Sequence, residues 1–314
     1  MQRPRVYITR RLALDPASVL GPGIEIDQHD SDLALPRAEF LRRAHGASAL
    51  LPILADRIDT ELLDAAPRLR IVANHAVGYD NVDVPACTAR GVWVTNTPDV
   101  LTDATADLTW ALILALTRRL REGESMVRAG NWPGWAPTQL LGRELRGAAL
   151  GIFGYGRIGR GVARRAEGFG MRVFFCSRGG GMPFDDLLAQ SDVISIHAPL
   201  TAETRHAFGA AELLRMKRGA LLINTARGPI VDEAALVAAL EAGHLGGAAL
   251  DVFEHEPAVH PGLMGRDDVV LLPHLGSATR ETRQAMATIA LSQVELVLRG
   301  ERPTHAINEV KHPP

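Results

Sequence analysis

The chain has 314 residues, 46% of them hydrophobic, which is enough for two domains that each bury a large apolar core. Its 34 basic and 36 acidic residues are interspersed and give a formal net charge of −2, which does not favour a nucleic acid or a membrane surface as partner. The N-terminal residues show no secretory signal, and the longest apolar run, 110–116, is far shorter than the roughly 20 residues that span a bilayer. The two cysteines, Cys87 and Cys176, lack a zinc-binding spacing, so we expect a cytoplasmic protein without a metal site.

The first hundred residues alternate short apolar runs with amphipathic stretches. The apolar runs predict strands at 5–9, 24–27, 47–53, 69–74 and 92–95. The amphipathic stretches predict helices at 36–45, 60–66 and 84–90. Strands that alternate with helices over short connections are typical of a parallel sheet covered on both faces.

The longest helical pattern follows at 103–121, with Thr102 or Asp103 as its expected cap. A loop rich in Pro and Gly comes next at 130–142 and contains Trp132 and Trp135. These tryptophans either pack within the chain or form a contact between subunits, where aromatic residues are often enriched.

A second alternating series begins near residue 148. It predicts strands at 149–153, 172–176, 192–196, 220–224, 247–250 and 269–272, with helices between them. A final helix at 280–298 is expected to return the chain to the first domain. We therefore predict two doubly wound α/β domains. A flavodoxin-like substrate domain (1–98 and 286–314) is interrupted by a Rossmann cofactor domain (99–285).

A glycine-rich turn joins the first strand of this second series to a helix. Residues 154–159 read G-Y-G-R-I-G, which matches the G-x-G-x-x-G pattern of dinucleotide-binding proteins. Gly154 permits the tight turn, Gly156 lets the backbone approach a pyrophosphate, and Gly159 lets helix and strand pack closely. The alternative is a tight turn that binds no ligand.

The end of the next predicted strand bears on the choice of cofactor. An Asp or Glu at this place normally binds the ribose hydroxyls of NAD, but this chain has Ser177 followed by Arg178. A serine donates a hydrogen bond and an arginine pairs with a phosphate, so the pair favours NADP(H). The short stretch at 178–184 leaves NAD(H) possible, and Arg178 as a plain surface residue is the remaining alternative.

Three polar side chains each follow a predicted strand of the second domain: Arg227, Glu256 and His274. The carboxyl ends of strands face the binding crevice of an open α/β sheet, so the three are expected at one site. Reduction of a 2-oxo acid needs a cation to hold the carboxylate and polarise the carbonyl, an acid to protonate the alkoxide, and a carboxylate that supports this acid. Arg227, His274 and Glu256 fit these roles in that order.

Each of these residues also has a plainer interpretation. Arg227 is alternatively a surface ion-pair partner, and His274 a hydrogen-bonded core residue. Glu256 and its neighbour Glu254 are alternatively loop charges, and we expect His255 and His260 to be solvated.

Four segments together resemble the D-isomer-specific 2-hydroxyacid dehydrogenase family over nearly the whole chain. They are 154–159, N-T-A-R-G (224–228) with V-D-E (231–233), 251–257, and P-H-L-G-S-A (273–278). Within the family the chain is most similar to glyoxylate/hydroxypyruvate reductases, through V-A-N-H-A-V-G-Y-D-N-V-D (72–83), residues 94–108 and the Ser177-Arg178 pair.

The resemblance implies that Arg227 binds substrate, that Glu256 supports the acid and that His274 donates the proton. It also implies that the backbone N–H groups of Val77 and Gly78 hold the substrate carboxylate. The residues that would then line the dinucleotide are Thr105, Gly154, Tyr155, Gly156, Arg157, Ile158, Gly159, Ser177, Arg178, Pro199, Thr225, Ala226, Arg227, Asp251, His274 and Gly276.

In related reductases an aromatic residue from one subunit reaches the site of the other, and Trp135 lies at the matching position. The resemblance thus implies a homodimer. Asn74 and His75 are either substrate contacts or packing and turn residues.

The implied reactions are glyoxylate to glycolate and hydroxypyruvate to D-glycerate. Three alternatives stay open: an NAD-dependent enzyme for another D-2-hydroxy acid, a dinucleotide-sensing protein without turnover, and a formate or phosphite oxidoreductase of the same architecture.

Overall fold

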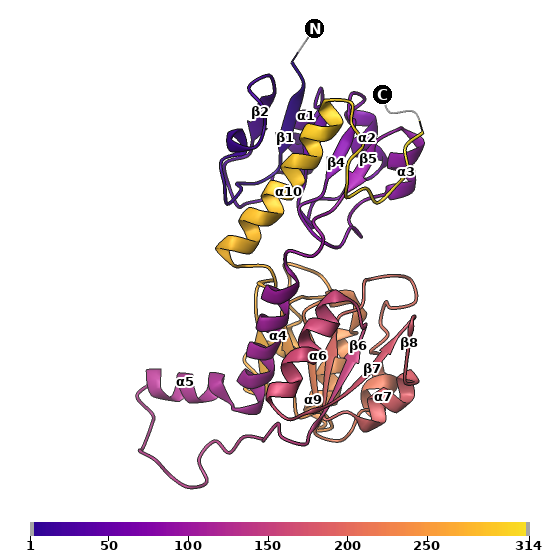
Figure 1. Ribbon diagram of the computed structural model, residues 1–314. Helices are drawn as coiled ribbons and strands as arrows, with labels where there is room; N and C mark the ends of the chain where they lie inside the picture. Colours follow the sequence, from indigo (N-terminus) through magenta and orange to yellow (C-terminus); the bar gives the residue numbers. More distant parts are fainter. Residues whose placement is uncertain (1–2, 312–314) are drawn as a thin grey trace. The chain divides into compact units, whose positions relative to one another are not determined.

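The computed structural model describes residues 3–311 and divides into two compact units (Figure 1). Unit 1 comprises Met1–Leu101 and Ala278–Pro314, and unit 2 comprises Thr102–Ser277. The units divide at 101/102 and 277/278, where the sequence indicated 98/99 and 285/286. Residues 1–2 and 312–314 of the expected first domain lie outside the described residues.

Unit 1 is built on a parallel sheet with the strand order β2-β1-β3-β4-β5. Its strands are β1 (Arg5–Ile8), β2 (Glu25–Gln28), β3 (Ala49–Leu51), β4 (Ile71–Ala73) and β5 (Trp93–Thr95). Its helices are α1 (Arg37–Ala44), α2 (Thr60–Ala65), α3 (Val84–Ala89) and α10 (Arg280–Leu298), with a 3₁₀ turn at Pro16–Ser18. Every element that the sequence predicted here is present, with ends within two residues of the prediction.

Strands β1, β3, β4 and β5 of unit 1 are buried, whereas the edge strand β2 is not. Successive side chains point to opposite sides of the sheet, so the buried strands supply two clusters. Tyr7, Leu50 and Val72 pack in one cluster with residues of α1, α2 and α3. Val6, Ala49 and Ile71 pack in the other with α10. The C-terminal helix therefore completes the core of the N-terminal sheet, as the sequence predicted.

Unit 2 contains a larger sheet with the strand order β12-β11-β10-β9-β6-β7-β8. Its strands are β6 (Ala149–Phe153), β7 (Arg172–Ser177), β8 (Gly180–Gly181), β9 (Val193–Ile196), β10 (Leu221–Asn224), β11 (Gly247–Leu250) and β12 (Val269–Leu271). Its helices are α4 (Thr102–Thr117), α5 (Leu120–Arg128), α6 (Arg157–Gly168), α7 (Phe184–Gln190), α8 (Ala210–Arg215) and α9 (Glu233–Glu241), with 3₁₀ turns at Gly228–Ile230 and Pro261–Leu263. All pairs are parallel except β7 with β8.

The helices of unit 2 cover both faces of this sheet. Residues of α4 and α6 pack in one cluster with β6, β9 and β10. Residues of α7, α8 and α9 pack in another with β9, β10 and β11. The strand order reverses between β6 and β9, and in such a sheet ligands bind beyond the carboxyl ends of the strands near this point.

The helix predicted at 103–121 is present but is interrupted near its end, at residues 118–119. The chain leaves the helical conformation after Thr117, Arg119 has a left-handed φ of 53°, and α5 begins at Leu120. Thr102 and Asp103 lie inside α4 and do not precede it as caps. The direction changes because α4 lies against the sheet, whereas α5 has no buried residue and lies, with the loop that follows it, off the body of unit 2 (Figure 1).

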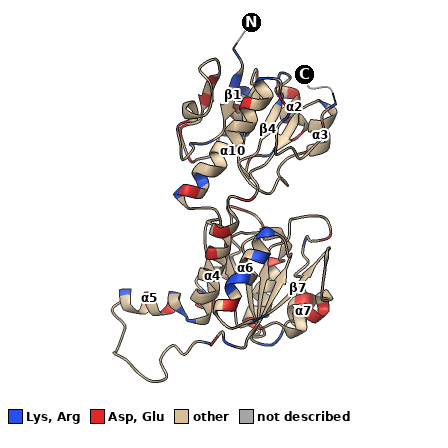
Figure 2. Ribbon diagram, viewed as in Figure 1, with Lys and Arg blue, Asp and Glu red and all other residues tan. Residues whose placement is uncertain are grey.

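Charged residues of both signs are spread over the helices of the two units (Figure 2). This distribution agrees with the nearly neutral formal charge of −2. Among the described residues, no helix combines the length and the hydrophobicity that a membrane crossing requires.

Candidate active site

The glycine turn after β6 has two glycines that the fold itself requires. Gly154 has a φ of 97°, and a Cβ there would lie 2.4 Å from the backbone nitrogen of Ala198 in the loop after β9. A Cβ on Gly159 would lie 2.3 Å from the carbonyl oxygen of Gly154. Both contacts are too close for any side chain, so these two positions bring α6 against β6 and β9.

Gly156 differs because the protein places nothing within 4 Å of a Cβ built on it. It caps α6 with a φ of −80°, which other residues adopt freely. The open space lies at the N-terminus of a 12-residue helix, whose free N–H groups and dipole attract phosphate. Internal packing does not explain the glycine, whereas the close approach of a dinucleotide does. The residues present therefore fit a nicotinamide dinucleotide.

The end of β7 forms a tight hairpin with β8. Ser177 pairs with Gly180, and its hydroxyl donates to the Gly180 carbonyl at 3.0 Å. Gly181 has a φ of 106°, and a Cβ there would lie 2.2 Å from the Phe175 carbonyl oxygen. The two-residue β8 is thus a short antiparallel strand at the edge of the sheet.

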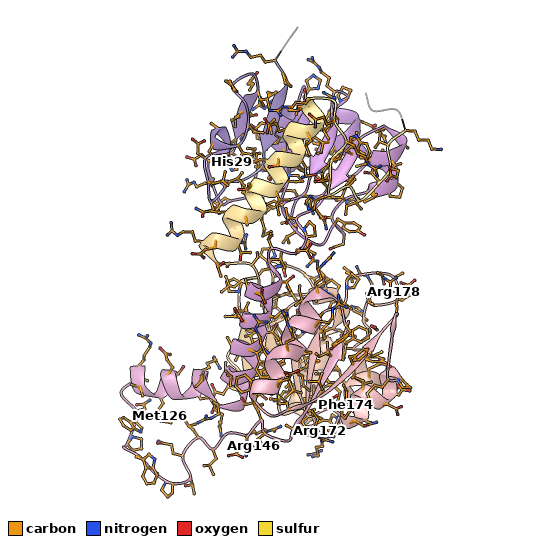
Figure 3. The ribbon with its side chains drawn as sticks, in the orientation of Figure 1. His29, Met126, Arg146, Arg172, Phe174 and Arg178 are labelled. Atoms are coloured by element: carbon orange, nitrogen blue, oxygen red, sulfur yellow. The ribbon has the colours of Figure 1, made fainter. Side chains whose placement is uncertain are left out.

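Arg178 is exposed at the turn of this hairpin, whereas Arg172 lies at the other end of β7 (Figure 3). No carboxylate occurs between residues 177 and 181. Glu203, in the loop after β9, is a carboxylate that responds to the charge of Arg178. Hydrogen bonds from Thr201 and from its own backbone lower the pKa of Glu203, with a smaller contribution from Arg178. No pattern in the sequence indicated this neighbour.

Arg227 lies just beyond β10, in a turn that its neighbours hold by hydrogen bonds. The Asn224 side chain donates to the Arg227 carbonyl at 2.9 Å and accepts from the N–H of Ala226 at 3.0 Å. The Thr225 and Thr109 hydroxyls lie 3.0 Å apart, which ties the same turn to α4. The half-buried Arg227 guanidinium donates to the carbonyl of Ala226 at 2.7 Å.

Gly228 lets this turn touch the segment that carries Glu256. A Cβ on Gly228 would lie 1.8 Å from the Phe253 carbonyl oxygen. Phe253 in turn donates its N–H to a Glu256 carboxylate oxygen at 3.1 Å. The loops after β10 and β11 are therefore in direct contact.

Glu256 and His274 form the central pair of the site. Oε2 of Glu256 lies 3.1 Å from Nδ1 of His274, and both side chains are about a quarter to a third exposed (31% and 25%). His274 has a left-handed φ of 55°, an unfavourable conformation for a residue that is not glycine, and its N–H donates to the Asp251 carbonyl at 2.9 Å. With Nδ1 facing the carboxylate, Nε2 is the ring nitrogen left to face a ligand.

Arg227 and His274 together keep Glu256 ionised. Burial raises the pKa of Glu256, but the hydrogen bond and charge of His274, the Phe253 N–H and the charge of Arg227 hold it below its ordinary value. Because the folded-state pKa is lowered, the contribution of this ionisation to folding stability is present above the ordinary value of 4.5. It is lost as the pH falls through the lowered pKa.

Asp251 fixes the backbone that follows His274. Its fully buried carboxylate accepts the N–H groups of Leu275 at 2.6 Å and Gly276 at 2.8 Å. Burial raises the pKa of Asp251 in spite of these two donors and the charge of His274. The Thr105 hydroxyl on α4 donates to the Gly276 carbonyl at 3.0 Å, so the His274 loop is held on two sides.

A second set of contacts, made by Glu233 at the start of α9, holds the loop that contains Glu256. The buried Glu233 carboxylate at the start of α9 accepts the N–H groups of Glu254 at 2.8 Å and His260 at 3.2 Å. Glu254 also lies 2.6 Å from Nε2 of His206. Glu254 is thus not a free loop charge, and His260, which caps a 3₁₀ turn through Nδ1, is not simply solvated. His255 is exposed, as expected.

The remaining candidate residues lie in several places. Val77 and Gly78 belong to a loop of unit 1, which also contains the buried Asn74 and His75. Among the residues expected at the dinucleotide, Tyr155 stacks on Phe175 with ring centroids 4.0 Å apart, and Pro199 is exposed in the loop after β9. Arg157 and Ile158 form the first turn of α6.

Trp135 is 83% exposed in the loop after α5, so it does not pack within the chain. The candidate His75 and the thiol Cys87 are buried and uncharged at neutral pH. Burial lowers the pKa of the His75 imidazole to about 4 and raises the pKa of the Cys87 thiol to about 12. Among residues 3–311, no group of three or more His, Cys, Asp or Glu side chains is placed to hold a metal ion.

The unit 2 site thus combines a guanidinium, an imidazole and an ionised carboxylate with a turn that fits a dinucleotide. A guanidinium polarises a carbonyl and binds a carboxylate, and an imidazole supported by a carboxylate donates a proton. This is a set of groups suited to carbonyl reduction.

Comparison with known proteins agrees with this chemistry. The family model described as D-isomer specific 2-hydroxyacid dehydrogenase, NAD binding domain, matches residues 110–276. The glyoxylate reductase of Thermococcus litoralis is 44% identical over 98% of this chain and 97% of its own length. That of Aeropyrum pernix is 47% identical over 98% and 97%.

Solved structures are similar over the full length as well. A protein of Thermus thermophilus superposes with a TM-score of 0.92 at 46% identity, covering 97% of this chain and 100% of the other. An NADPH-dependent glyoxylate/hydroxypyruvate reductase of Sinorhizobium meliloti, solved with NADP and malonate, gives 0.84 at 36% identity, covering 99% of both chains.

The two kinds of glycine in the β6–α6 turn predict opposite effects of one added methyl group. In Gly156→Ala the methyl enters open space, so the free energy of unfolding should change by less than about 0.5 kcal/mol. The Kd for the dinucleotide should rise about tenfold or more, a loss of about 1.4 kcal/mol of binding free energy.

In the matched variant Gly159→Ala the methyl group meets the Gly154 carbonyl. The free energy of unfolding should therefore be about 1–3 kcal/mol lower than in the wild type. Denaturant unfolding and fluorescence titration with NADPH measure the two quantities. Unchanged dinucleotide affinity in Gly156→Ala would contradict the assignment of this turn.

Proposed function

The chain belongs to the D-isomer specific 2-hydroxyacid dehydrogenase family, and we propose that it reduces glyoxylate and hydroxypyruvate with NAD(P)H, preferring NADPH. The observation that carries the proposal is the Glu256–His274 pair, 3.1 Å apart and within the field of Arg227. These groups are the acid, its support and the carbonyl-binding cation that reduction of a 2-oxo acid needs. Relatives named glyoxylate reductases, 43–47% identical over nearly the whole chain, favour a small substrate.

In the proposed reaction each residue has one task. The Arg227 guanidinium binds the substrate carboxylate and polarises the oxo group, and the N–H groups of Val77 and Gly78 bind the same carboxylate. The bound reduced dinucleotide supplies the hydride. Nε2 of His274 gives its proton to the forming alkoxide, while the Glu256 carboxylate at Nδ1 orients the ring.

NADPH preference rests on the end of β7. Ser177 and Arg178 stand where NAD-binding proteins usually carry a carboxylate, and Arg178 is exposed at the hairpin turn. A guanidinium pairs with the 2′-phosphate that distinguishes NADP from NAD. The short stretch at 178–184 leaves NADH usable.

We further propose a homodimer formed through α5 and the loop that follows it. Leu120, Val127, Trp132, Trp135 and Leu141 of this segment are all more than half exposed. Clustered apolar surface of this kind is typical of a protein interface. A dimer would cover this surface and let Trp135 of each copy reach the site of the other.

The cytoplasm is the proposed location. Cys87 and Cys176 are both free thiols, as is usual for proteins of a reducing compartment.

Initial rates with glyoxylate and hydroxypyruvate, each with NADPH and NADH, test the proposed activity. We expect turnover of both acids, with a larger kcat/KM for NADPH than for NADH. Preference for a larger 2-oxo acid would indicate another dehydrogenase of the family. No turnover across a panel of 2-oxo acids, formate and phosphite would contradict an enzymatic role.

Arg178→Ala should lower the NADPH/NADH ratio of kcat/KM by about tenfold or more, because a charge-assisted phosphate contact contributes about 1.5–3 kcal/mol. Arg172→Ala provides a matched control at the opposite end of the same strand (Figure 3). This control removes the same charge and should leave the ratio unchanged. Equal ratios in wild type and Arg178→Ala would refute the assignment.

Glu256→Gln should lower kcat by about 10- to 100-fold at neutral pH, because the His274 ring loses the carboxylate that orients it. Because its lowered pKa keeps Glu256 ionised throughout the neutral range, the loss should be present across that range and should shrink as the pH falls through this pKa, where the wild-type carboxylate is itself protonated. Glu254→Gln, whose carboxylate pairs with His206, should leave kcat near the wild-type value across the same range.

Sedimentation equilibrium should give twice the 33.8 kDa mass of one chain. Trp135→Ala should keep this mass, because removing one side chain leaves most of the interface intact. It should raise the KM for glyoxylate, because the partner's site loses the side chain that reaches it. A monomeric wild type would contradict the proposed role of α5.

A further inference from the structure

The loop after β4 in unit 1 has three successive carbonyl groups fixed by hydrogen bonds. The Ala76 carbonyl accepts from the Thr97 N–H at 2.9 Å. The Val77 carbonyl accepts from the Asn96 side-chain amide at 2.8 Å. The Gly78 carbonyl accepts from the Asn74 side-chain amide at 2.8 Å.

These contacts also decide where the N–H groups of the loop point. In a trans peptide the C=O and the following N–H point in opposite directions, and the only cis bond among the described residues is Glu256–Pro257. The N–H of Val77 is therefore directed away from Thr97, and the N–H of Gly78 away from Asn96. Among residues 3–311 neither N–H has a hydrogen-bond acceptor, so both remain available to an anion.

Asn74 is itself held by a buried polar network. It is fully buried, and its amide exchanges hydrogen bonds with the Asn81 amide at 3.2 Å in each direction. The same Asn81 nitrogen lies 3.2 Å from the Ile53 carbonyl and 3.0 Å from that of Asp56. Asn81 thus joins the loop after β3 to the loop after β4.

The loop after β3 is fastened in turn to the end of β1. The buried Asp56 carboxylate accepts from the Thr9 hydroxyl at 2.5 Å and lies 3.3 Å from the Arg10 guanidinium. Asp56 also accepts the N–H of Ile53 at 3.0 Å. Buried polar networks whose members are paired in this way restrict a loop to one conformation.

We propose that Asn96 is a positioning residue that holds the Gly78 N–H in the orientation that binds the substrate carboxylate, while the Asn74 amide, which fixes the Gly78 carbonyl, keeps the loop in one conformation. The proposal rests on the proposed function, in which the N–H groups of Val77 and Gly78 bind a 2-oxo acid. The asparagines act through the backbone. They donate to the carbonyls of the loop and need no contact with the substrate themselves.

The test is Asn96→Ala in the full-length enzyme, because Asn96 is only half-buried and its removal leaves the buried Asn74 network in place. We expect the KM for glyoxylate and the Ki for oxalate, an unreactive dicarboxylate, to rise together by about tenfold. The kcat at saturation should change by less than about twofold, and the KM for NADPH should not change, because the proton donor and the dinucleotide turn are untouched.

Asn308→Ala is the matched control for a purely structural asparagine of the same unit. Asn308 accepts the N–H of Val94 and donates to the carbonyl of Val92, both at strand β5. Its loss should lower the unfolding midpoint and leave the KM for glyoxylate unchanged.

If the wild type is active and Asn96→Ala leaves the KM and the Ki unchanged, the inference is overturned while the proposed function stands. Equal increases in Asn96→Ala and Asn308→Ala would also overturn it, because a general loss of stability would then explain both. A wild type that reduces no 2-oxo acid would overturn the proposed function, and the inference with it.

Discussion

The hydrogen bond between Glu256 and His274 is the interaction on which the rest of the site depends. A carboxylate 3.1 Å from one ring nitrogen leaves the other nitrogen as the only one that can serve a ligand. The chain maintains this contact against two unfavourable effects, since Glu256 is partly buried and His274 has a left-handed φ of 55°. Asp251 offsets them by binding the two N–H groups that follow His274.

The topology of unit 2 explains how residues so far apart in sequence meet. Arg227, Glu256 and His274 follow β10, β11 and β12, which are neighbours in one parallel sheet. Their loops leave the same edge, and Gly228 allows the first two loops to touch. The glycine turn after β6 lies at the same edge of the sheet, so all parts of the candidate site are loops that follow parallel strands.

Much of this arrangement was predictable from sequence because it follows from local patterns. Strand and helix positions follow from short-range periodicity, and the glycine turn and the Arg, Glu and His follow from their place after strands. The break between α4 and α5 was not predictable, because both segments have helical sequences. Whether a segment packs against the sheet, as α4 does and α5 does not, depends on the tertiary structure. The buried Asp251 contacts and the Asn74–Asn81–Asp56 network were likewise hidden, since they join loops that are distant in the chain.

A crystal structure of the protein with NADPH and oxamate, an unreactive analogue of a 2-oxo acid, is the most direct test of the proposed chemistry. We expect the Arg227 guanidinium and Nε2 of His274 both to lie within hydrogen-bond distance of the oxamate carbonyl oxygen, with Nδ1 still paired to Glu256. Oxamate bound away from Arg227, or a His274 ring that faces Glu256 through neither nitrogen, would contradict the roles assigned to these residues.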